Sequence, residues 1–255
     1  MTMSSELIEQ AATELLARRA SARQGPRLPQ DCRPADFEDA WQIQQAVSRR
    51  LGQPIGGWKS ALPSPGKQVV ATIYAPTIDH GAECALPAGA TALDTVRVEP
   101  EIAFVLAHDL PPRPQPYSQA EVNAAVGSVH AALEICASRY ADRDGVPFAE
   151  MLADGLVNSG LWLGPALTAP EAPAFELSWQ VEGEPVQSQA AHHPDGNARA
   201  PLYWLANFLR ERGVQLQAGQ AVITGSHAGV LALPLGKKAR FDYGALASFE
   251  VTFSR

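Results

Sequence analysis

The sequence has little of what marks membrane, secreted or nucleic-acid-binding proteins. Its formal net charge is −7 and no basic run exceeds two residues, which disfavours binding to nucleic acid. No apolar run approaches the ~20 residues of a membrane helix. The residues near the N-terminus include several glutamates and lack the basic region and following apolar region of a secretory signal. We therefore expect a cytoplasmic protein without nucleic-acid or membrane partners.

The sequence also lacks common metal and cofactor motifs. Its cysteines, Cys32, Cys84 and Cys136, are odd in number, widely spaced and form no C-x-x-C pair, which argues against a disulfide framework or a thiolate zinc site. The histidines show no zinc spacing, and no P-loop or Gly-x-Gly-x-x-Gly motif is present. With 255 residues, 46% of them hydrophobic, the chain can bury a core without staples. Nucleotide cofactors are not expected.

Hydrophobic periodicity predicts helices at the start of the chain and two more further on. Asp36 is placed to cap the second helix and Gly52 to end it, and Ser118 with Glu121 has the spacing of a capping box. The predicted helices cover residues 5–22, 36–52, 118–127 and 201–212. The first of these is amphipathic and needs a surface on which to pack.

From residue 55 onwards, short runs rich in branched residues alternate with proline and glycine, a pattern typical of strands. The strongest candidate strands are residues 96–107, 129–138, 158–163, 175–182, 220–224 and 246–253. Strands outnumber helices and do not alternate with them, so we predict an α+β fold with a mainly antiparallel or mixed sheet. We expect residues 1–54 to form a helical segment packed on a compact core of residues 55–255.

Two glutamates open an otherwise apolar strand. In Glu99-Pro100-Glu101 the two-residue period of a strand places both carboxylates on one face, roughly 7 Å apart at the backbone. The repulsion between them is relieved if one is protonated or if a hard divalent ion such as Mg²⁺ or Mn²⁺ binds. The alternative is that both lie on the solvated face of a half-buried sheet.

A third glutamate lies in the apolar run 131–137. An ionised Glu134 is costly to bury there without a partner, so it requires a nearby cation. That cation is either a metal shared with Glu99 and Glu101 or the guanidinium of Arg139 or Arg143.

Two further segments could contribute to a site. Lys59 follows glycines in an apolar, strand-like segment, where it could neutralise an oxyanion or substrate carboxylate, or reach past the core to water. Ser226 directly follows Gly225, so this turn lacks the spacing of a nucleophile elbow. It is either a substrate-binding turn or a plain strand connection.

The order of these motifs resembles the fumarylacetoacetate hydrolase superfamily, in the branch of 2-keto-4-pentenoate hydratases and 4-oxalocrotonate decarboxylases. The resemblance covers nearly the whole chain, and its most specific part is the Glu-x-Glu followed by a distant Glu. The segments that carry it are Gly-Trp-Lys at 57–59, Val-Glu-Pro-Glu-Ile-Ala-Phe-Val-Leu at 98–106, Ala-Leu-Glu-Ile-Cys-Ala-Ser-Arg at 132–139, Leu-Ala-Asp at 152–154 with Asn158, and Ala-Gly-Gln-Ala-Val-Ile-Thr-Gly-Ser at 218–226.

The resemblance implies a mixed β-roll core, a homo-oligomer, and Mg²⁺ or Mn²⁺ that chelates the carboxylate and 2-oxo group of a small 2-oxo acid. Matching positions imply a metal site made by Glu99, Glu101 and Glu134 and a catalytic Lys59 that stabilises the anionic intermediate or assists proton transfer. Asn158 and Ser226 match positions that line the substrate site.

The implied reaction is hydration of a 2-hydroxydienoate or 2-oxo-alkenoate through a metal-stabilised enolate. Decarboxylation of a 4-oxalocrotonate-like acid is the first alternative, because it passes through the same enolate, and C–C hydrolysis is the next. Family members often carry an acidic residue in the segment matching 73–76, and this chain has none. A non-catalytic subunit that binds metal and 2-oxo acid is therefore a third alternative.

Overall fold

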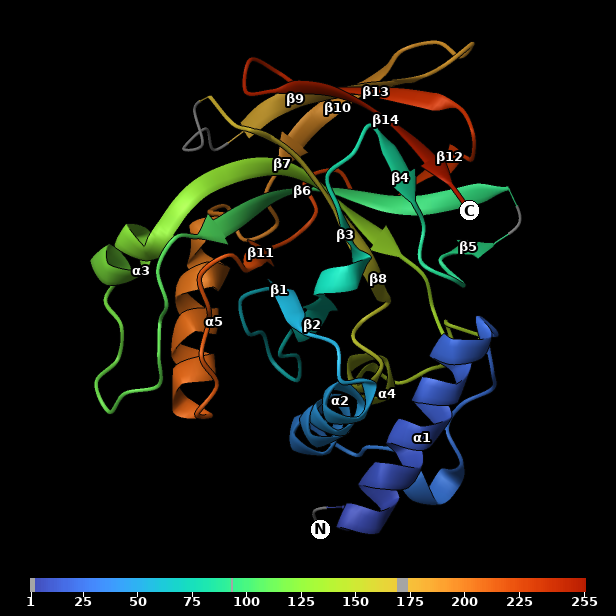
Figure 1. Ribbon diagram of the computed structural model, residues 1–255, viewed down its shortest axis with the longest axis vertical. Helices are drawn as coiled ribbons and strands as arrows, with labels where there is room; N and C mark the ends of the chain where they lie inside the picture. Colours follow the sequence, from blue (N-terminus) through green and yellow to red (C-terminus); the bar gives the residue numbers. More distant parts are fainter. Residues whose placement is uncertain (1–2, 93, 169–173) are drawn as a thin grey trace.

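The computed structural model describes residues 3–92, 94–168 and 174–255. Two β-sheets pack on each other, with helices around the lower part of the larger, curled sheet (Figure 1). The helices are α1 (Ser5–Ser21), α2 (Phe37–Leu51), α3 (Gln119–Ala125), α4 (Phe148–Ala153) and α5 (Arg199–Glu211), with short 3-10 turns at Gln30–Cys32 and Ala75–Thr77. Among the described residues, no helix combines the length and apolar character needed to cross a bilayer.

The larger sheet has the strand order β2-β1-β11-β6-β7-β8-β3, and β5 and β12 also pair with β6. Its strands are β1 (Ile55–Ser60), β2 (Val70–Tyr74), β3 (Ile78–Asp79), β5 (Thr91–Ala92), β6 (Thr95–Leu106), β7 (Val126–Cys136), β8 (Asn158–Ala166), β11 (Ala221–Ile223) and β12 (Leu231–Pro234). β1 pairs with β11, and β3 with β8, in parallel, whereas the other pairs of this sheet are antiparallel.

The smaller sheet has the order β10-β9-β13-β14-β4. Its strands are β4 (Glu83–Ala85), β9 (Ala174–Val181), β10 (Gln187–His192), β13 (Lys238–Tyr243) and β14 (Ser248–Ser254). Only the pairing of β14 with β4 is parallel among the described strands of this sheet. The prediction of an α+β fold with a mixed, curled β-roll core is confirmed.

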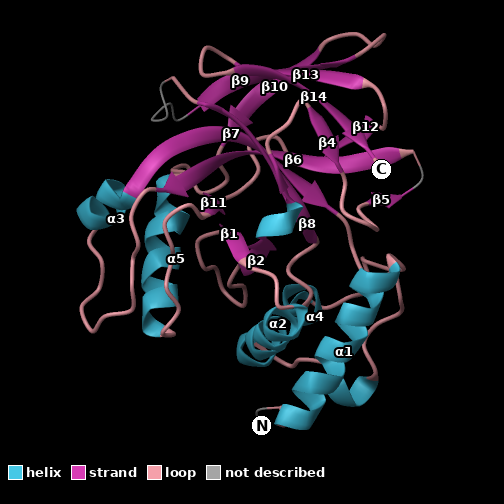
Figure 2. Cartoon of the chain, in the orientation of Figure 1, coloured by secondary structure: helices cyan, strands magenta, loops and turns pink. Residues whose placement is uncertain are grey.

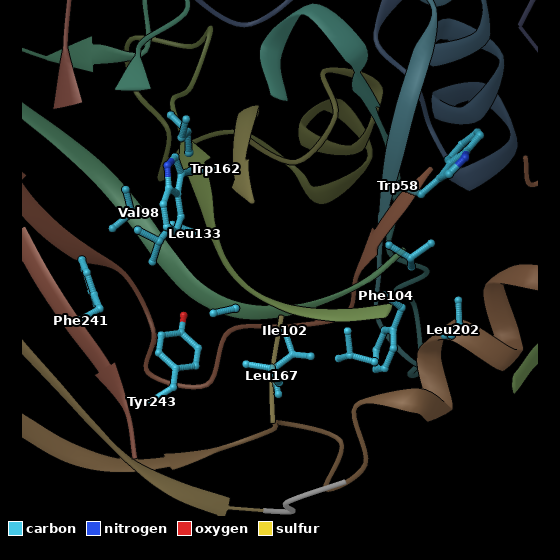
Figure 3. Packing of buried hydrophobic residues seen from close by; sticks show 14 of the residues in the cluster. Trp58, Val98, Ile102, Phe104, Leu133, Trp162, Leu167, Leu202, Phe241 and Tyr243 are labelled. Atoms are coloured by element: carbon cyan, nitrogen blue, oxygen red, sulfur yellow. The ribbon is translucent and has the colours of Figure 1, made fainter. Parts of the chain in front are cut away.

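The two faces of the β6–β7 pair differ in chemistry because side chains alternate along each strand. Val98, Ile102 and Leu133 point into the main core, opposite Phe241 and Tyr243 of the smaller sheet (Figure 3). The other face therefore carries the intervening residues, which include the glutamates of both strands.

The helices α1, α2 and α4 pack together below the sheets around a separate hydrophobic cluster (Figure 2). Asp36 caps α2 by accepting a hydrogen bond from the Asp39 amide, and Gly52 ends it in the left-handed conformation, as predicted. α4 was not predicted from the sequence. Because α4 follows β7, this helical layer includes more than the N-terminal segment, and the boundary at residue 54 stays a prediction.

The predicted helix that begins after Ser118 ends earlier than expected. Its capping box with Glu121 is present, but α3 stops at Ala125 and Gly127 lies inside β7. A Cβ atom at Gly127 would lie 2.7 Å from the Cβ of Ala107, so this glycine permits the close approach of neighbouring strand ends. Gly127 is therefore a packing residue of a strand, and the prediction that the helix extends to residue 127 was wrong.

Candidate active site

The register of β6 and β7 places the predicted carboxylates on one face. Glu99 lies directly opposite Glu134, and Glu101 lies opposite Ala132, two residues before Glu134. Paired residues on antiparallel strands share a face, so Glu99 and Glu134 converge across the strands. The side chains of Glu101 and Glu134 are fully buried, whereas Glu99 is half-buried. The sequence interpretation in which these glutamates simply line a solvated face does not describe this arrangement.

Lys59 of β1 is the cation that contacts Glu134. Its Nζ donates to both carboxylate oxygens, at 2.8 Å each, and to the Leu156 carbonyl at 3.3 Å. Asn158 Nδ2, at the start of β8, donates to Glu134 Oε1 at 2.9 Å. Neither arginine that the sequence offered as a partner of Glu134 takes that place. Arg139 pairs with Asp154, and Arg143 makes no ion pair among the described residues.

The loop that supplies the Leu156 carbonyl is strained. Gly155, Leu156 and Val157 have consecutive φ values of 82°, 52° and 62°. The left-handed region suits glycine but is unfavourable for leucine and especially for the β-branched valine. Such strain persists only where the surrounding structure enforces it, and it is common at functional sites.

Glu101 is held from the other side by the turn after β11. The Gly225 amide donates to Glu101 Oε2 at 2.7 Å, and Gly225 has a φ of 140°, which a residue with a side chain adopts with strain. The Ser226 hydroxyl donates instead to the carbonyls of Pro100 and Gly229, at 3.4 and 3.0 Å. The described contact between this turn and the carboxylates is thus made by Gly225, and the role of Ser226 in substrate binding stays a prediction.

The carboxylate cluster is short of positive charge. Burial, followed by the charge of Glu134, raises the pKa of Glu101 well above its ordinary value, and the same causes raise the pKa of Glu99. Burial acts to lower the pKa of the Lys59 ammonium, but the surrounding carboxylates, led by Glu134, raise it overall. One ammonium therefore faces three carboxyl groups, and a further cation would favour their ionised forms.

The donor set fits a hard divalent cation. A carboxylate oxygen of Glu99, one of Glu134 and the Cys136 sulfur lie within 4.8 Å of one another. Burial raises the pKa of the Cys136 thiol well above its usual value, which keeps the sulfur protonated and a poor metal ligand. Oxygen ligands are those that Mg²⁺ and Mn²⁺ prefer, so the oxygens of Glu99 and Glu134 are the part of this group that suits such an ion, and Glu101 as a third ligand stays a prediction. Sequence reasoning missed Cys136, although its spacing of two from Glu134 places it on the same strand face.

Two buried histidines lie beside the turn that contains Gly225. His193 Nε2 is 3.1 Å from the Thr224 carbonyl, and the ring of His227 is 5.3 Å from that of His193. His227 Nδ1 is buried with no hydrogen-bond partner among the described residues. The polar run around His192 and His193 is typical of a solvated loop, but His193 is only 5% exposed.

The sequence family described as fumarylacetoacetate (FAA) hydrolase C-terminal matches residues 51–252, and the chain belongs to this family. A 2-keto-4-pentenoate hydratase of Paraburkholderia xenovorans (strain LB400) is 29% identical over 231 residues, which cover 86% of this chain and 84% of that protein. A 4-oxalocrotonate decarboxylase of a Pseudomonas species is 30% identical over 155 residues, or 60% and 58% of the two chains.

A solved structure shares the fold over the full length. It is that of 4-oxalocrotonate decarboxylase from Pseudomonas putida G7, complexed with magnesium and adipate, with a TM-score of 0.77 and 20% sequence identity. The similarity covers 99% of each chain. The family thus includes hydratases and decarboxylases that resemble this chain along most of its length.

Proposed function

We propose that this chain is a divalent-metal-dependent lyase that hydrates a 2-hydroxydienoate or 2-oxo-alkenoate. The observation that carries the proposal is the convergence of the half-buried Glu99 and the buried Glu134 beside Lys59, with Glu101 on the same face. Family membership and the hydratase relatives support the same reaction class. We place the enzyme in the cytoplasm, as a homo-oligomer.

In this proposal Glu99, Glu101 and Glu134 hold Mg²⁺ or Mn²⁺. When bound, the ion supplies positive charge beside the carboxylate and 2-oxo group of the substrate, which lowers the free energy of the enolate. Binding by three carboxylates also removes the repulsion that the buried cluster carries without a cation. The magnesium in the related decarboxylase structure agrees with this choice of ion.

In this proposal, groups of the protein orient the carboxylates of the site and neutralise negative charge there. Asn158 and Lys59 fix the carboxylate of Glu134, and the Gly225 amide fixes that of Glu101. Lys59 holds an ammonium proton next to the site, where it stabilises a developing oxyanion or passes a proton to the substrate. Asn158 and Ser226 are proposed to line the substrate pocket.

Decarboxylation of a 4-oxalocrotonate-like 2-oxo acid is the second candidate. It is favoured by the full-length structural similarity to a protein of that name. A third candidate is a non-catalytic subunit that binds metal and 2-oxo acid. It is motivated by the absence of an acidic residue at 73–76, where the Tyr74 hydroxyl instead lies 3.0 Å from that of Ser48.

The test is turnover of 2-hydroxypenta-2,4-dienoate, measured as the loss of its dienol absorbance. It is measured once with Mg²⁺ or Mn²⁺ and again after a chelator is added. Metal-dependent loss without release of CO₂ is the expected result. Release of CO₂ from a 4-oxalocrotonate-like acid, with no hydration, would establish the decarboxylase. Binding of a 2-oxo acid without turnover of either compound would leave the non-catalytic subunit.

A further inference from the structure

A pocket with two unpaired arginines adjoins the carboxylate cluster. It has a volume of about 220 Å³, and its lining includes Arg97, Arg143, Cys136 and Tyr140. Within residues 3–92, 94–168 and 174–255, the arginines whose side chains make neither a hydrogen bond nor an ion pair are Arg23, Arg97 and Arg143. Two of these three guanidinium groups therefore line a single pocket.

The register of the strands fixes where this pocket lies relative to the site. Arg97 is two residues before Glu99 on β6 and directly opposite Cys136, which is two residues after Glu134 on β7. Arg97 and Cys136 thus form the next cross-strand pair on the same face, about 7 Å along the strands from the pair Glu99 and Glu134. Cys136 belongs to both places, since its sulfur lies within 4.8 Å of carboxylate oxygens of Glu99 and Glu134.

Arg143 approaches the same place from the loop after β7. Arg143 lines the pocket together with Arg97 and Cys136, so its guanidinium group lies on the side of the pocket that faces the end of β7. Arg97 and Arg143 are both exposed, so their charges stay accessible to a ligand. Two residues along the strands, this face of the β6–β7 pair therefore changes from carboxylates to exposed guanidinium groups.

We propose that Arg97 and Arg143 bind a second carboxylate at the far end of the substrate, so that the chain acts on dicarboxylic 2-oxo acids in preference to monocarboxylic ones. This inference rests on the proposed function, because it requires the 2-oxo acid end of the substrate to lie at the glutamates. A carboxylate is planar and accepts two parallel hydrogen bonds from a guanidinium group. The separation of about 7 Å matches a short carbon chain between the two acid groups.

The experiment compares two stable ligands by isothermal titration calorimetry in the presence of Mg²⁺. 2-Oxoadipate carries a second carboxylate, whereas 2-oxohexanoate has the same chain length and ends in a methyl group. The variants are the double substitution Arg97→Gln with Arg143→Gln and, as a matched control, Arg240→Gln. Arg240 is an exposed arginine on β13 that pairs with Asp242 in the smaller sheet. Thermal melting of each variant confirms that it is folded.

Wild-type protein is expected to bind 2-oxoadipate about tenfold or more tightly than 2-oxohexanoate, the effect of a charge-assisted hydrogen bond. The preference disappears in the double variant and is retained in Arg240→Gln. Equal affinities in the wild-type protein, or a preference that survives the double substitution, overturn the dicarboxylate site and leave the proposed function intact. Failure to bind either acid overturns the proposed function and this inference with it.

Discussion

Lys59 and Glu134 form a buried ion pair between strands that are not neighbours in the sheet. The lysine Nζ lies 2.8 Å from both carboxylate oxygens, although 75 residues separate the two positions in the sequence. β11 and β6 lie between β1 and β7 in the larger, curled sheet, so the ion pair spans two intervening strands (Figure 1). Because the ammonium neutralises Glu134 inside the protein, the chain has an internal counter-charge for this carboxylate before any metal binds.

Replacement of this lysine separates its proposed catalytic role from metal binding. We expect Lys59→Met to retain Mg²⁺ and to lose about 10²–10³-fold in kcat, the effect of removing one group that stabilises an oxyanion. Metal titration and steady-state kinetics measure the two properties. Lys67→Met, at an exposed position, is the matched control and should behave as wild type. Normal turnover in Lys59→Met would reduce Lys59 to a structural residue.

Glu101→Gln tests the proposed metal site and retains the hydrogen bond between residue 101 and the turn at Gly225. Glutamine keeps an oxygen that can accept from the Gly225 amide but removes one negative charge from the cluster. We expect metal affinity to be lost and the circular dichroism spectrum to be unchanged. Metal content after dialysis provides the measurement, with the exposed Glu250→Gln as control. An unchanged metal content in Glu101→Gln would count against the assignment of this residue.

The stability of the region below the site depends on a second buried ion pair. Arg139 Nε lies 2.7 Å from Asp154 Oδ2, and Arg139 also donates to the carbonyl and hydroxyl groups at the start of β8. We expect Asp154→Asn to reduce the free energy of unfolding by about 3–5 kcal/mol, because the arginine charge is left buried without its partner.

Urea denaturation measures this loss. The partly exposed pair of Arg240 and Asp242 provides the comparison, and Asp242→Asn should cost no more than about 1 kcal/mol. Equal effects of the two substitutions would show that burial of the Arg139 pair adds nothing to its contribution.

Stability should also depend on pH through His227. Burial, followed by the nearby His193, lowers the pKa of His227 from 6.5 to about 4. Between these values the unfolded chain binds the proton and the folded chain does not, so the free energy of unfolding falls as pH is lowered from 6.5 to 4. The contribution lost is about 3 kcal/mol. His227→Gln should flatten this part of the stability profile, and an identical slope in both proteins would contradict the assignment.

The sequence predicted much of the secondary structure, because helix caps and strand periodicity depend on residues that are close together in the chain. The caps at Asp36, Gly52 and Ser118 and the long strands of the core follow from spacing and residue type alone. α4 was missed because a helix of six residues gives almost no periodicity. The burial of His193 could not be predicted, because the polar run around it is typical of a solvated loop, whereas its packing against Thr224 is a contact over 31 residues.

The site was only partly visible in the sequence for the same reason. The period of two placed Glu99 and Glu101 on one face, but the pairing of Glu99 with Glu134 depends on a register between distant strands. The amide of Gly225 carries no side-chain signal, so its bond to Glu101 could not be read from residue types. The turn that contains Ser226 contacts Glu101 through the Gly225 amide, and the role of Ser226 in substrate binding stays a prediction.

The left-handed conformation of Val157 implies a conflict between robustness and activity. Glycine at this position would adopt the same backbone angles without the steric penalty of about 1–2 kcal/mol that valine carries. Val157→Gly should therefore cost less stability than a typical loss of a side chain, or even increase the melting temperature. The same change would loosen the adjoining Leu156 carbonyl that accepts from Lys59. A gain in stability together with a loss of turnover in Val157→Gly would show that the strained loop fixes the ammonium of Lys59 at the expense of stability.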